Sequence, residues 1–452
     1  MENKNDLTTG SIWKKMMIFS LPLIASNTLQ VLFNMSDIAV VGKFSGADSL
    51  GAVGSTSILV TLFTGIVIGL GNGVNVIVAR LIGQRHYDEL KSAVKSSFIT
   101  CLIGGIFVFL TMFFGSKFFL QLINTKEELI DKATTYLLIY SLGMPALAIY
   151  NFGNGCFSAS GNTRKPLIYL FIAGIMNVIL NLFFVIVLKL DVVGVAIASI
   201  ISQYTSATLI TISLMRYNNE CKLIFSYKTN IKYVKQVLHL GLPAGIQNSI
   251  FAIANLFIQS GVNSFDTVMV EGNSAAANFD SLVYDVMAAF YMSTSSFIGQ
   301  NYGAMNKKRV KDSYLISMLY AFIAGLILGA LLMIFKRQFL SIFTNDQEVI
   351  EAGVQRINIM AFSYAFSSTM DTSIAASRGL GKTIVSMIIV ISGSCIFRVA
   401  WIYTIFAFYH TIASLYLLYI FSWLITGFFE LIYFIYCYNK IFNKKDKLNI
   451  AL

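Results

Sequence analysis

Long apolar stretches separated by short polar connections dominate this sequence from residue 15 to residue 437. A helix rises 1.5 Å per residue, so about 20 apolar residues cross the roughly 30 Å hydrocarbon core of a bilayer. Each stretch reaches that length, and we therefore predict an all-α integral membrane protein. Its twelve expected transmembrane helices cover residues 15–42, 50–79, 92–115, 133–157, 164–189, 193–216, 235–262, 275–300, 312–336, 353–377, 383–408 and 411–437.

The two halves of the sequence resemble each other at an offset near 220 residues. LPLIASN (21–27) recurs as LPAGIQN (242–248), and FLQLINTKEELIDKA (119–133) recurs as FLSIFTNDQEVIEAG (339–353). Six helices return a chain to the side on which it started, so both halves run in the same direction. We predict two six-helix lobes related by a pseudo-two-fold axis along the membrane normal, an architecture typical of secondary transporters.

The predicted repeat also sets the domain boundaries. We expect an N-terminal lobe over residues 1–215, a polar cytoplasmic linker over 216–235, a C-terminal lobe over 236–438 and a cytoplasmic tail over 439–452. No short apolar region followed by a small-residue cleavage site opens the chain, so the first helix is expected to stay in the protein rather than act as a signal peptide.

Charged residues are few and unevenly placed. They make up 12% of the chain, against about 25% in soluble proteins, and 56% of the residues are hydrophobic. The formal net charge is +11, and most of the basic residues lie in connections on the side of the N-terminus, with most acids on the other side. This bias predicts that both termini are cytoplasmic and argues against a nucleic-acid-binding face. The five cysteines show no CxxC pairing and are expected to be apolar core residues.

Polar residues follow one face of the first predicted helix. Asn27, Gln30, Asn34 and Asp37 are spaced three, four and three apart, which places them on one side of a helix. A carboxylate at membrane depth is costly and normally faces a bundle interior or a hydrated cavity. We therefore predict that this face lines such a cavity. Hydrogen bonding between helices is the alternative for the amide residues.

Other predicted helices carry matching polar faces. In the seventh helix Asn248, Asn255 and Gln259 share a face that has no carboxylate. In the tenth helix Asp371 follows Tyr364, Ser367 and Ser368, and it corresponds to Asn151 in the repeat. We expect one intramembrane acid in each lobe, at non-equivalent places. These residues are predicted to line the substrate cavity between the lobes.

The fifth, sixth and eleventh helices add three further candidate groups. Asn177 and Asn181 lie one turn apart and, with Ser199 and Asp37, would supply four side-chain oxygens if the helices converge. Arg398 is expected to be the one intramembrane base, paired with Asp371, Asp285 or backbone carbonyls, in a structural or a coupling role.

These residues resemble the multidrug and toxic compound extrusion family, within a superfamily that includes polysaccharide and lipid-precursor flippases. The resemblance covers almost the whole chain and depends on stretches taken together rather than on one motif. They are LPLIASN with NMSDIAVVGKFSGADSLGAVG (21–54), SASGNTRKPLIYLFIAGIMNVILNLFFV (158–185), GVAIASIISQ (194–203), GLPAGIQNSIF (241–251) and STSSFIGQNYGA (293–304).

The resemblance implies a coupling-ion site in the first lobe. Asp37 matches the acid of the family's first helix, Asn177 an asparagine of the fifth, and Ser199 a hydroxyl-bearing residue of the sixth. Asn181 is a departure, since many relatives have Asp there. Asp371 matches an acid used for cation binding in another branch, which also uses a Glu in the seventh helix; residues 250–252 supply none.

The expected function is secondary active efflux of organic, often cationic, compounds in exchange for H⁺ or Na⁺ by alternating access, with no other cofactor. The alternative is a lipid-linked oligosaccharide or lipid-precursor flippase, which would need several cations at depth. An enzyme is not expected, because HExxH and GxSxG are missing and ASRGLGKT (376–383) lacks the first Gly of a P-loop. We expect a multi-pass monomer in a bacterial inner membrane, with small-molecule substrates.

Overall fold

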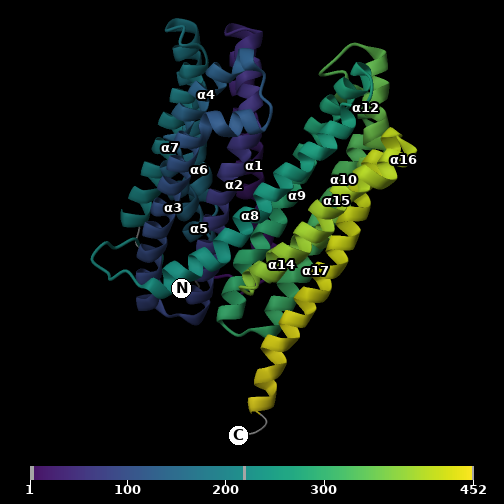
Figure 1. Cartoon of the computed structure of the whole chain (residues 1–452). Helices are drawn as coiled ribbons and strands as arrows, with labels where there is room; N and C mark the ends of the chain where they lie inside the picture. Colours follow the sequence, from purple (N-terminus) through teal and green to yellow (C-terminus); the bar gives the residue numbers. More distant parts are fainter. Residues whose placement is uncertain (1–4, 217–219, 450–452) are drawn as a thin grey trace. The chain divides into compact units, whose positions relative to one another are not determined.

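The computed structural model describes residues 5–216 and 220–449, and these residues form helices joined by short connections (Figure 1). Parts of the predicted linker (217–219) and tail (450–452) lie outside the described residues. The elements are α1 Ile12–Phe44, α2 Ala47–Gln84, α3 Tyr87–Leu122, α4 Glu127–Ser141, α5 Met144–Ala159, α6 Arg164–Leu182, η1 Phe183–Val187, α7 Asp191–Arg216, α8 Ile231–Val262, α9 Thr267–Gly303, α10 Lys307–Ile334, α11 Lys336–Leu340, α12 Gln347–Met360, α13 Ser363–Gly379, α14 Thr383–Val390, η2 Ile391–Ile396, α15 Phe397–Trp401, η3 Ile402–Phe406, α16 Ala407–Tyr409 and α17 Ile412–Asn449.

Each of the twelve predicted spans corresponds to one helix or to a run of consecutive helices. The fourth span is the pair α4 and α5, which meet at a bend of 47°, and the eleventh runs from α14 to α16. Within the described residues nine helices are long and apolar enough to cross a membrane, or ten if the bent pair counts as one span. Helix α9 and the pair α12 and α13 fall short because they carry many polar and charged side chains.

The chain divides into two compact units. Unit 1 contains residues 1–6 and 25–249, and unit 2 contains residues 7–24 and 250–452. Two long helices are therefore shared: the first part of α1 packs in unit 2, and the first part of α8 packs in unit 1. In unit 2, the ring of Phe19 lies 5.7 Å from that of Phe297; in unit 1, the Ser249 hydroxyl donates to the Leu62 carbonyl at 2.8 Å.

Close backbone contact between α2 and the first part of α8 is a central feature of unit 1. A Cβ atom on Gly69 would lie 2.3 Å from the backbone nitrogen of Gly245, and one on Gly73 would lie 2.8 Å from the carbonyl oxygen of Val237. Side chains at these positions would hold the two helices apart. Small residues allow this approach, as in many membrane helix pairs.

The segment before α8 is held against α3 within unit 1. The ammonium group of Lys95 donates to the carbonyl oxygens of Phe225 at 2.7 Å and Tyr227 at 2.5 Å. The described part of the predicted linker is therefore bound to α3 of unit 1 by hydrogen bonds.

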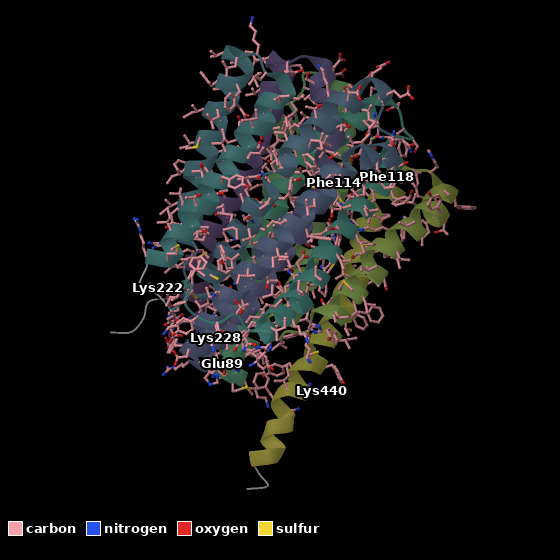
Figure 2. The ribbon with its side chains drawn as sticks, turned by 60° about the vertical axis from the view of Figure 1, so that its left-hand side comes forward. Glu89, Phe114, Phe118, Lys222, Lys228 and Lys440 are labelled. Atoms are coloured by element: carbon pink, nitrogen blue, oxygen red, sulfur yellow. The ribbon has the colours of Figure 1, made fainter. Side chains whose placement is uncertain are left out.

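Glu89 connects the start of α3 with the start of α8, at the end of unit 1 that also carries Lys222 and Lys228 (Figure 2). The hydroxyl of Tyr233 donates to Oε2 of Glu89, and Lys232 Nζ lies 3.3 Å from the same oxygen. The hydrogen bond from Tyr233, followed by that from Lys232, lowers the pKa of Glu89 below its usual value.

We predict that Gly69→Ala destabilises the protein, because the new Cβ would overlap the backbone of α8. Overpacking of this kind costs about 1–3 kcal/mol. Thermal unfolding of the purified protein in detergent measures the loss. Gly54→Ala is the matched control, since nothing lies within 4 Å of a Cβ at that position of the same helix. Equal melting temperatures for the two variants would contradict the close contact.

We also predict a pH-dependent effect of Tyr233→Phe, which removes the main hydrogen bond to Glu89. Because the folded pKa of Glu89 is lowered, its stabilisation is present above the unfolded value of about 4.3 and is lost as the pH falls through the folded value. The melting temperatures of wild type and variant should therefore differ most near neutral pH and converge in acid. A constant difference at all pH values would assign the effect to packing of the ring.

Candidate functional site

Asp37 lies in a cluster of amide side chains in unit 1. The Nδ2 group of Asn181 donates to Oδ1 of Asp37 at 2.5 Å and to Oδ1 of Asn177 at 3.2 Å. Asp37 comes from α1 and is half-buried, whereas both asparagines come from α6 and are buried. The structure thus brings together three of the four residues predicted for the coupling-ion site.

The positions of Asn177 and Asn181 follow from the helix they share. Residues four apart lie on the same face of a helix, so Asn181 in the last turn of α6 contacts both Asp37 of α1 and Asn177 of its own helix. A π-helical turn, Phe183–Val187, follows at once. Such turns are frequent at functional sites because they change the direction of a helix face.

One acceptor of the cluster has no partner in the described structure. The Oδ1 atom of Asn181 is buried and accepts no hydrogen bond, although its amino group donates twice. A buried acceptor without a donor is costly. If the side-chain amide of Asn181 rotated by 180°, its oxygen could accept a hydrogen bond from a protonated Asp37. A bound cation would instead contact the side-chain oxygens of Asp37, Asn177 and Asn181.

Ser199, the fourth residue predicted for the coupling-ion site, does not bond to this cluster in the described part of the chain. Ser199 lies buried on α7, and within the described residues it has no hydrogen bond to Asp37, Asn177 or Asn181. In the same unit, the rings of Tyr136 and Tyr140 on α4 stack 5.7 Å apart.

The predicted polar face of the first helix is accessible. Gln30 and Asn34 are exposed and Asn27 is half-buried. On α8 the predicted face divides between the units: Asn248 is half-buried in unit 1, whereas Asn255 and Gln259 are exposed in unit 2. Polar side chains seldom face lipid, so their exposure fits a hydrated surface.

Asn151 and Asp371 differ in their surroundings. Asn151 donates to the carbonyl of Leu147 in its own helix at 2.9 Å, which satisfies it locally. Asp371 is buried on α13, and its Oδ2 atom has no hydrogen-bond partner within the described residues. The second residue therefore retains capacity to bind a proton or cation.

Arg398 is buried in unit 2 but is not paired as predicted. Its guanidinium donates to Ser422 at 3.1 Å and Asn255 at 3.2 Å, and it lies over the ring of Tyr419 at 4.9 Å. Within the described residues no carboxylate reaches it at ion-pair distance. The expected pairing with Asp371 or Asp285 was wrong, because neutral groups and an aromatic face hold the charge instead.

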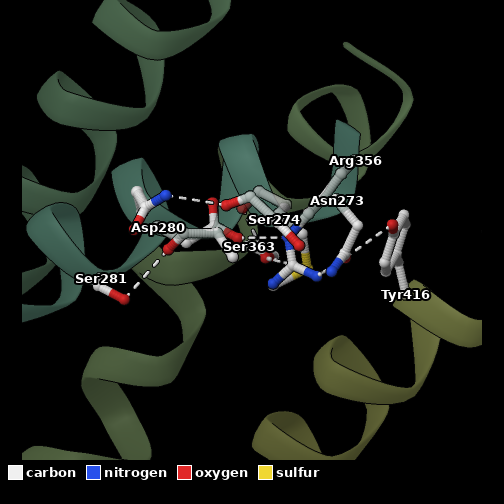
Figure 3. A network of polar contacts seen from close by, with 10 residues as sticks. Asn273, Ser274, Asp280, Ser281, Arg356, Ser363 and Tyr416 are labelled. Carbon is white, nitrogen blue, oxygen red and sulfur yellow. Dashed lines mark hydrogen bonds and ion pairs between the residues drawn. The ribbon is translucent and has the colours of Figure 1, made fainter. Parts of the chain in front are cut away.

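A second buried guanidinium, which the sequence analysis overlooked, lies in unit 2 (Figure 3). Arg356 of α12 forms a 2.6 Å ion pair with Asp280 of α9 and donates to Asn273 at 2.7 Å. The hydroxyl of Tyr416 on α17 donates to the same asparagine, and its ring lies 5.0 Å from the guanidinium. This network joins α9, α12 and α17 and satisfies the charge of Arg356.

A buried carboxylate on α17 was also overlooked. Glu430 is fully buried, accepts a 2.8 Å hydrogen bond from Ser386, and has a second oxygen without a partner within the described residues. The expectations of one intramembrane base and of one acid per lobe were therefore wrong. A search for charges inside the predicted spans would have found Asp280, Arg356 and Glu430.

Comparison with known proteins matches both halves of the chain to one family. The MatE family model matches residues 22–183 and again 243–404, so the second match begins 221 residues after the first. This confirms the internal repeat predicted from the sequence.

Individual relatives cover most of the chain. It is 29% identical over 367 residues to a "Probable multidrug resistance protein YpnP" of Bacillus subtilis, spanning 80% of this chain and 81% of that protein. It is 24% identical over 360 residues to a "FAD transporter" of Shewanella oneidensis, spanning 78% of each. A solved multidrug resistance MATE family transporter in an outward-facing conformation superimposes with a TM-score of 0.90 at 21% identity, covering 98% of this chain and 99% of that one.

The MatE family model covers well over half of the chain, because it matches each half once. The superposition on the solved MATE transporter covers 98% of the chain. The chain therefore belongs to the MatE family, the multidrug and toxic compound extrusion proteins.

Proposed function

We propose that this protein exports small organic compounds, often cationic, in exchange for H⁺ or Na⁺. The observation behind this proposal is the arrangement of Asp37 in unit 1. Its carboxylate accepts a hydrogen bond from Asn181, which also donates to Asn177, and no basic side chain is in ion-pair contact with it within the described residues. A structural carboxylate would be expected to have a charged partner. One held by amides can gain or lose a cation without breaking an ion pair.

The coupling follows from what each cation does to the cluster. A proton on Asp37 removes its charge and adds a donor for the unpartnered oxygen of Asn181. Sodium would instead draw the oxygens of Asp37, Asn177 and Asn181 toward itself. Either event changes how α1 pairs with α6. Coupling requires that the cation bind the two states of this helix pair with different affinity.

The substrate class draws support from the family and from named relatives. The YpnP relative carries a multidrug resistance name. Exposed polar groups on α1 and α8, together with the aromatic and methionine side chains of the chain, suit variable organic ligands. Aromatic faces and the carboxylates Asp37 and Asp371 would favour cationic ones.

An anionic substrate is the second candidate, including the lipid-linked sugars expected as the alternative. Two guanidiniums of unit 2, Arg398 and Arg378, have no carboxylate at ion-pair distance within the described residues. The relative named as a FAD transporter gives this candidate further support. Guanidiniums without a carboxylate partner would attract phosphate groups.

We place the protein in a bacterial plasma membrane as a monomer with both termini in the cytoplasm. The uneven distribution of basic residues supports the orientation. The bacterial relatives support the source. Accessibility of cysteines introduced at exposed loop positions to a membrane-impermeant thiol reagent in whole cells tests it.

We predict that Asp37→Asn abolishes gradient-driven transport of a fluorescent cationic dye in proteoliposomes, because the amide cannot bind a proton and binds sodium weakly. Separate pH and sodium gradients identify the coupling ion. Asp48→Asn, at an exposed carboxylate of α2, is the matched control and should leave transport unchanged. Equal transport by wild type and Asp37→Asn would make Asp37 structural. Movement of an anionic dye but no cationic dye would favour the second candidate.

We further predict that Asn181→Asp strengthens sodium binding, because a second carboxylate oxygen would face the cluster. A gain of tenfold in affinity corresponds to about 1.4 kcal/mol. The increase in melting temperature caused by Na⁺ relative to K⁺ reports the binding. Asn263→Asp, at an exposed position, is the control. A sodium response that Asn181→Asp leaves unchanged would argue that the ion binds elsewhere.

A further inference from the structure

Residues 7–24 belong to unit 2, although the chain on either side of them belongs to unit 1. The chain enters unit 2 between Asp6 and Leu7, and it leaves unit 2 within α1, directly after Ile24. These two crossings lie well apart, since the helical part from Ile12 to Ile24 alone is about 18 Å long at 1.5 Å per residue. The start of the described chain is therefore attached to unit 2 between two separate crossings.

Arg309 of α10 binds the backbone of this segment. Its guanidinium donates to the carbonyl oxygens of Leu7 at 2.9 Å, Thr9 at 3.1 Å and Gly10 at 2.8 Å. Its Nε group donates to Oδ1 of Asn301 on α9 at 3.1 Å, which helps to orient the planar guanidinium. One side chain thus binds three carbonyl groups within four residues.

Helix α9 binds the same segment from its last turn. Nδ2 of Asn301 donates to the carbonyl oxygen of Leu7 at 3.2 Å, and the backbone N–H of Leu7 donates to Oε1 of Gln300 at 3.0 Å. The side chain of Leu7 is buried in an apolar cluster that includes Phe19 and Phe297. Both backbone groups of Leu7 and its side chain are therefore bound by unit 2. We call Arg309, Asn301 and Gln300 the N-terminal clamp.

The chain just before the crossing packs against unit 1. Asn5 lies on the turn between α5 and α6, where Gly161 has a left-handed φ of 82°. A Cβ atom on Gly161 would overlap the carbonyl oxygen of Asn5 and would lie 2.9 Å from its carbonyl carbon, so this position has room only for glycine. Asn5 and Leu7 are two residues apart, and at most about 7 Å of extended chain joins these two attachments.

Two separate crossings restrict motion more than one crossing does. If the crossing after Ile24 were the only one in this part of the chain, the units could rotate about it. Rotation that separates the attachments of Asn5 and Leu7 must instead detach one of them, because the short chain between them cannot stretch. The attachment to unit 2 includes five hydrogen bonds to the segment and the buried side chain of Leu7.

The other half of the chain has a clamp of the same type. Lys95 of α3 binds the carbonyl oxygens of Phe225 and Tyr227, in the segment that precedes α8. In each case a basic residue of the third span of one half holds the backbone that precedes the first span of the other half. Residues 220–249 lie wholly in unit 1, however, so the Lys95 clamp spans no crossing. Of these two clamps, that of Arg309 is the one beside a crossing.

We propose that residues 5–10 form a strap that restrains the separation of the two units at the end of the molecule where the chain begins. The strap detaches from the N-terminal clamp when the protein opens at that end. Arg309 and Asn301 are positioning residues in this device, since they bind backbone rather than substrate or coupling ion. The role of the strap in transport rests on the proposed alternating access, but its attachment to both units does not.

The experiment measures the distance between two spin labels by pulsed electron paramagnetic resonance, with the purified full-length protein in lipid nanodiscs. The labels are attached to cysteines introduced as Gln84→Cys and Ala304→Cys, exposed positions at the ends of α2 and α9. The five native cysteines are buried. Arg309→Gln should shift the distance distribution to longer distances, because it removes four hydrogen bonds of the clamp.

A second variant lengthens the strap and leaves the clamp intact. Six Gly and Ser residues inserted between Asp6 and Leu7 add about 20 Å of slack and should give the same shift as Arg309→Gln. A shift in Arg309→Gln without one in the insertion variant would overturn the proposal, because Arg309 would then only stabilise unit 2. Unchanged distances in both variants would also overturn it. If Arg309→Gln does not fold, the insertion variant alone decides.

Matched controls separate the strap from general effects. Lys308→Gln removes a positive charge at the exposed neighbouring position of α10 and should leave the distances unchanged. The same six residues inserted after Asn345, in the exposed connection between α11 and α12 of unit 2, lengthen a loop that joins no two units and should also have no effect. Equal shifts in these controls would overturn the assignment to the strap. The measurement uses no gradient and no substrate, so a failure of dye transport would bear on the proposed function alone.

Discussion

An ionisable group inside the apolar core of a membrane must be paired, hydrogen-bonded or protonated, and this constraint governs the interior of the protein. The cost of leaving a charge there without compensation is several kcal/mol, comparable to the stability of a whole domain. Asp37 meets the requirement through the amide of Asn181. Arg356 meets it through Asp280, Asn273 and two tyrosine rings. Helix α6 must therefore approach α1, and α12 must approach α9, at these depths.

The two halves share a repeat but solve this problem with different chemistry. In unit 1, the carboxylate of Asp37 is hydrogen-bonded to the amide of Asn181, which also bonds to Asn177. Unit 2 holds a buried guanidinium, that of Arg356, in an ion pair with Asp280. Two repeats can keep the same helix packing while their polar residues differ. Their binding sites can then differ without a change of fold.

Close helix contact supplies the framework for these sites. Gly69 of α2 and Gly245 of α8 leave the two backbones in contact, and no larger residue fits between them. Membrane helices gain little from the hydrophobic effect on association, so packing of this kind must supply the stability that a soluble core would obtain from burial. This backbone contact holds the first part of α8 in unit 1, and the Tyr233–Glu89 hydrogen bond holds the start of the same helix.

The sequence by itself determined the number and placement of the membrane helices, the repeat, and the face that carries Asp37, because these depend on local patterns of period 3.6 and on segment length. It also identified Asn177 and Asn181 as possible partners of Asp37. Only the tertiary structure decided that Asn181 bonds to Asp37, and that Ser199 has no hydrogen bond to either within the described residues. It also decided that Arg398 contacts Asn255 and Ser422, and that Arg356 pairs with Asp280. The reason is physical: contacts between helices depend on the rotation and depth of each helix, and no local pattern fixes either.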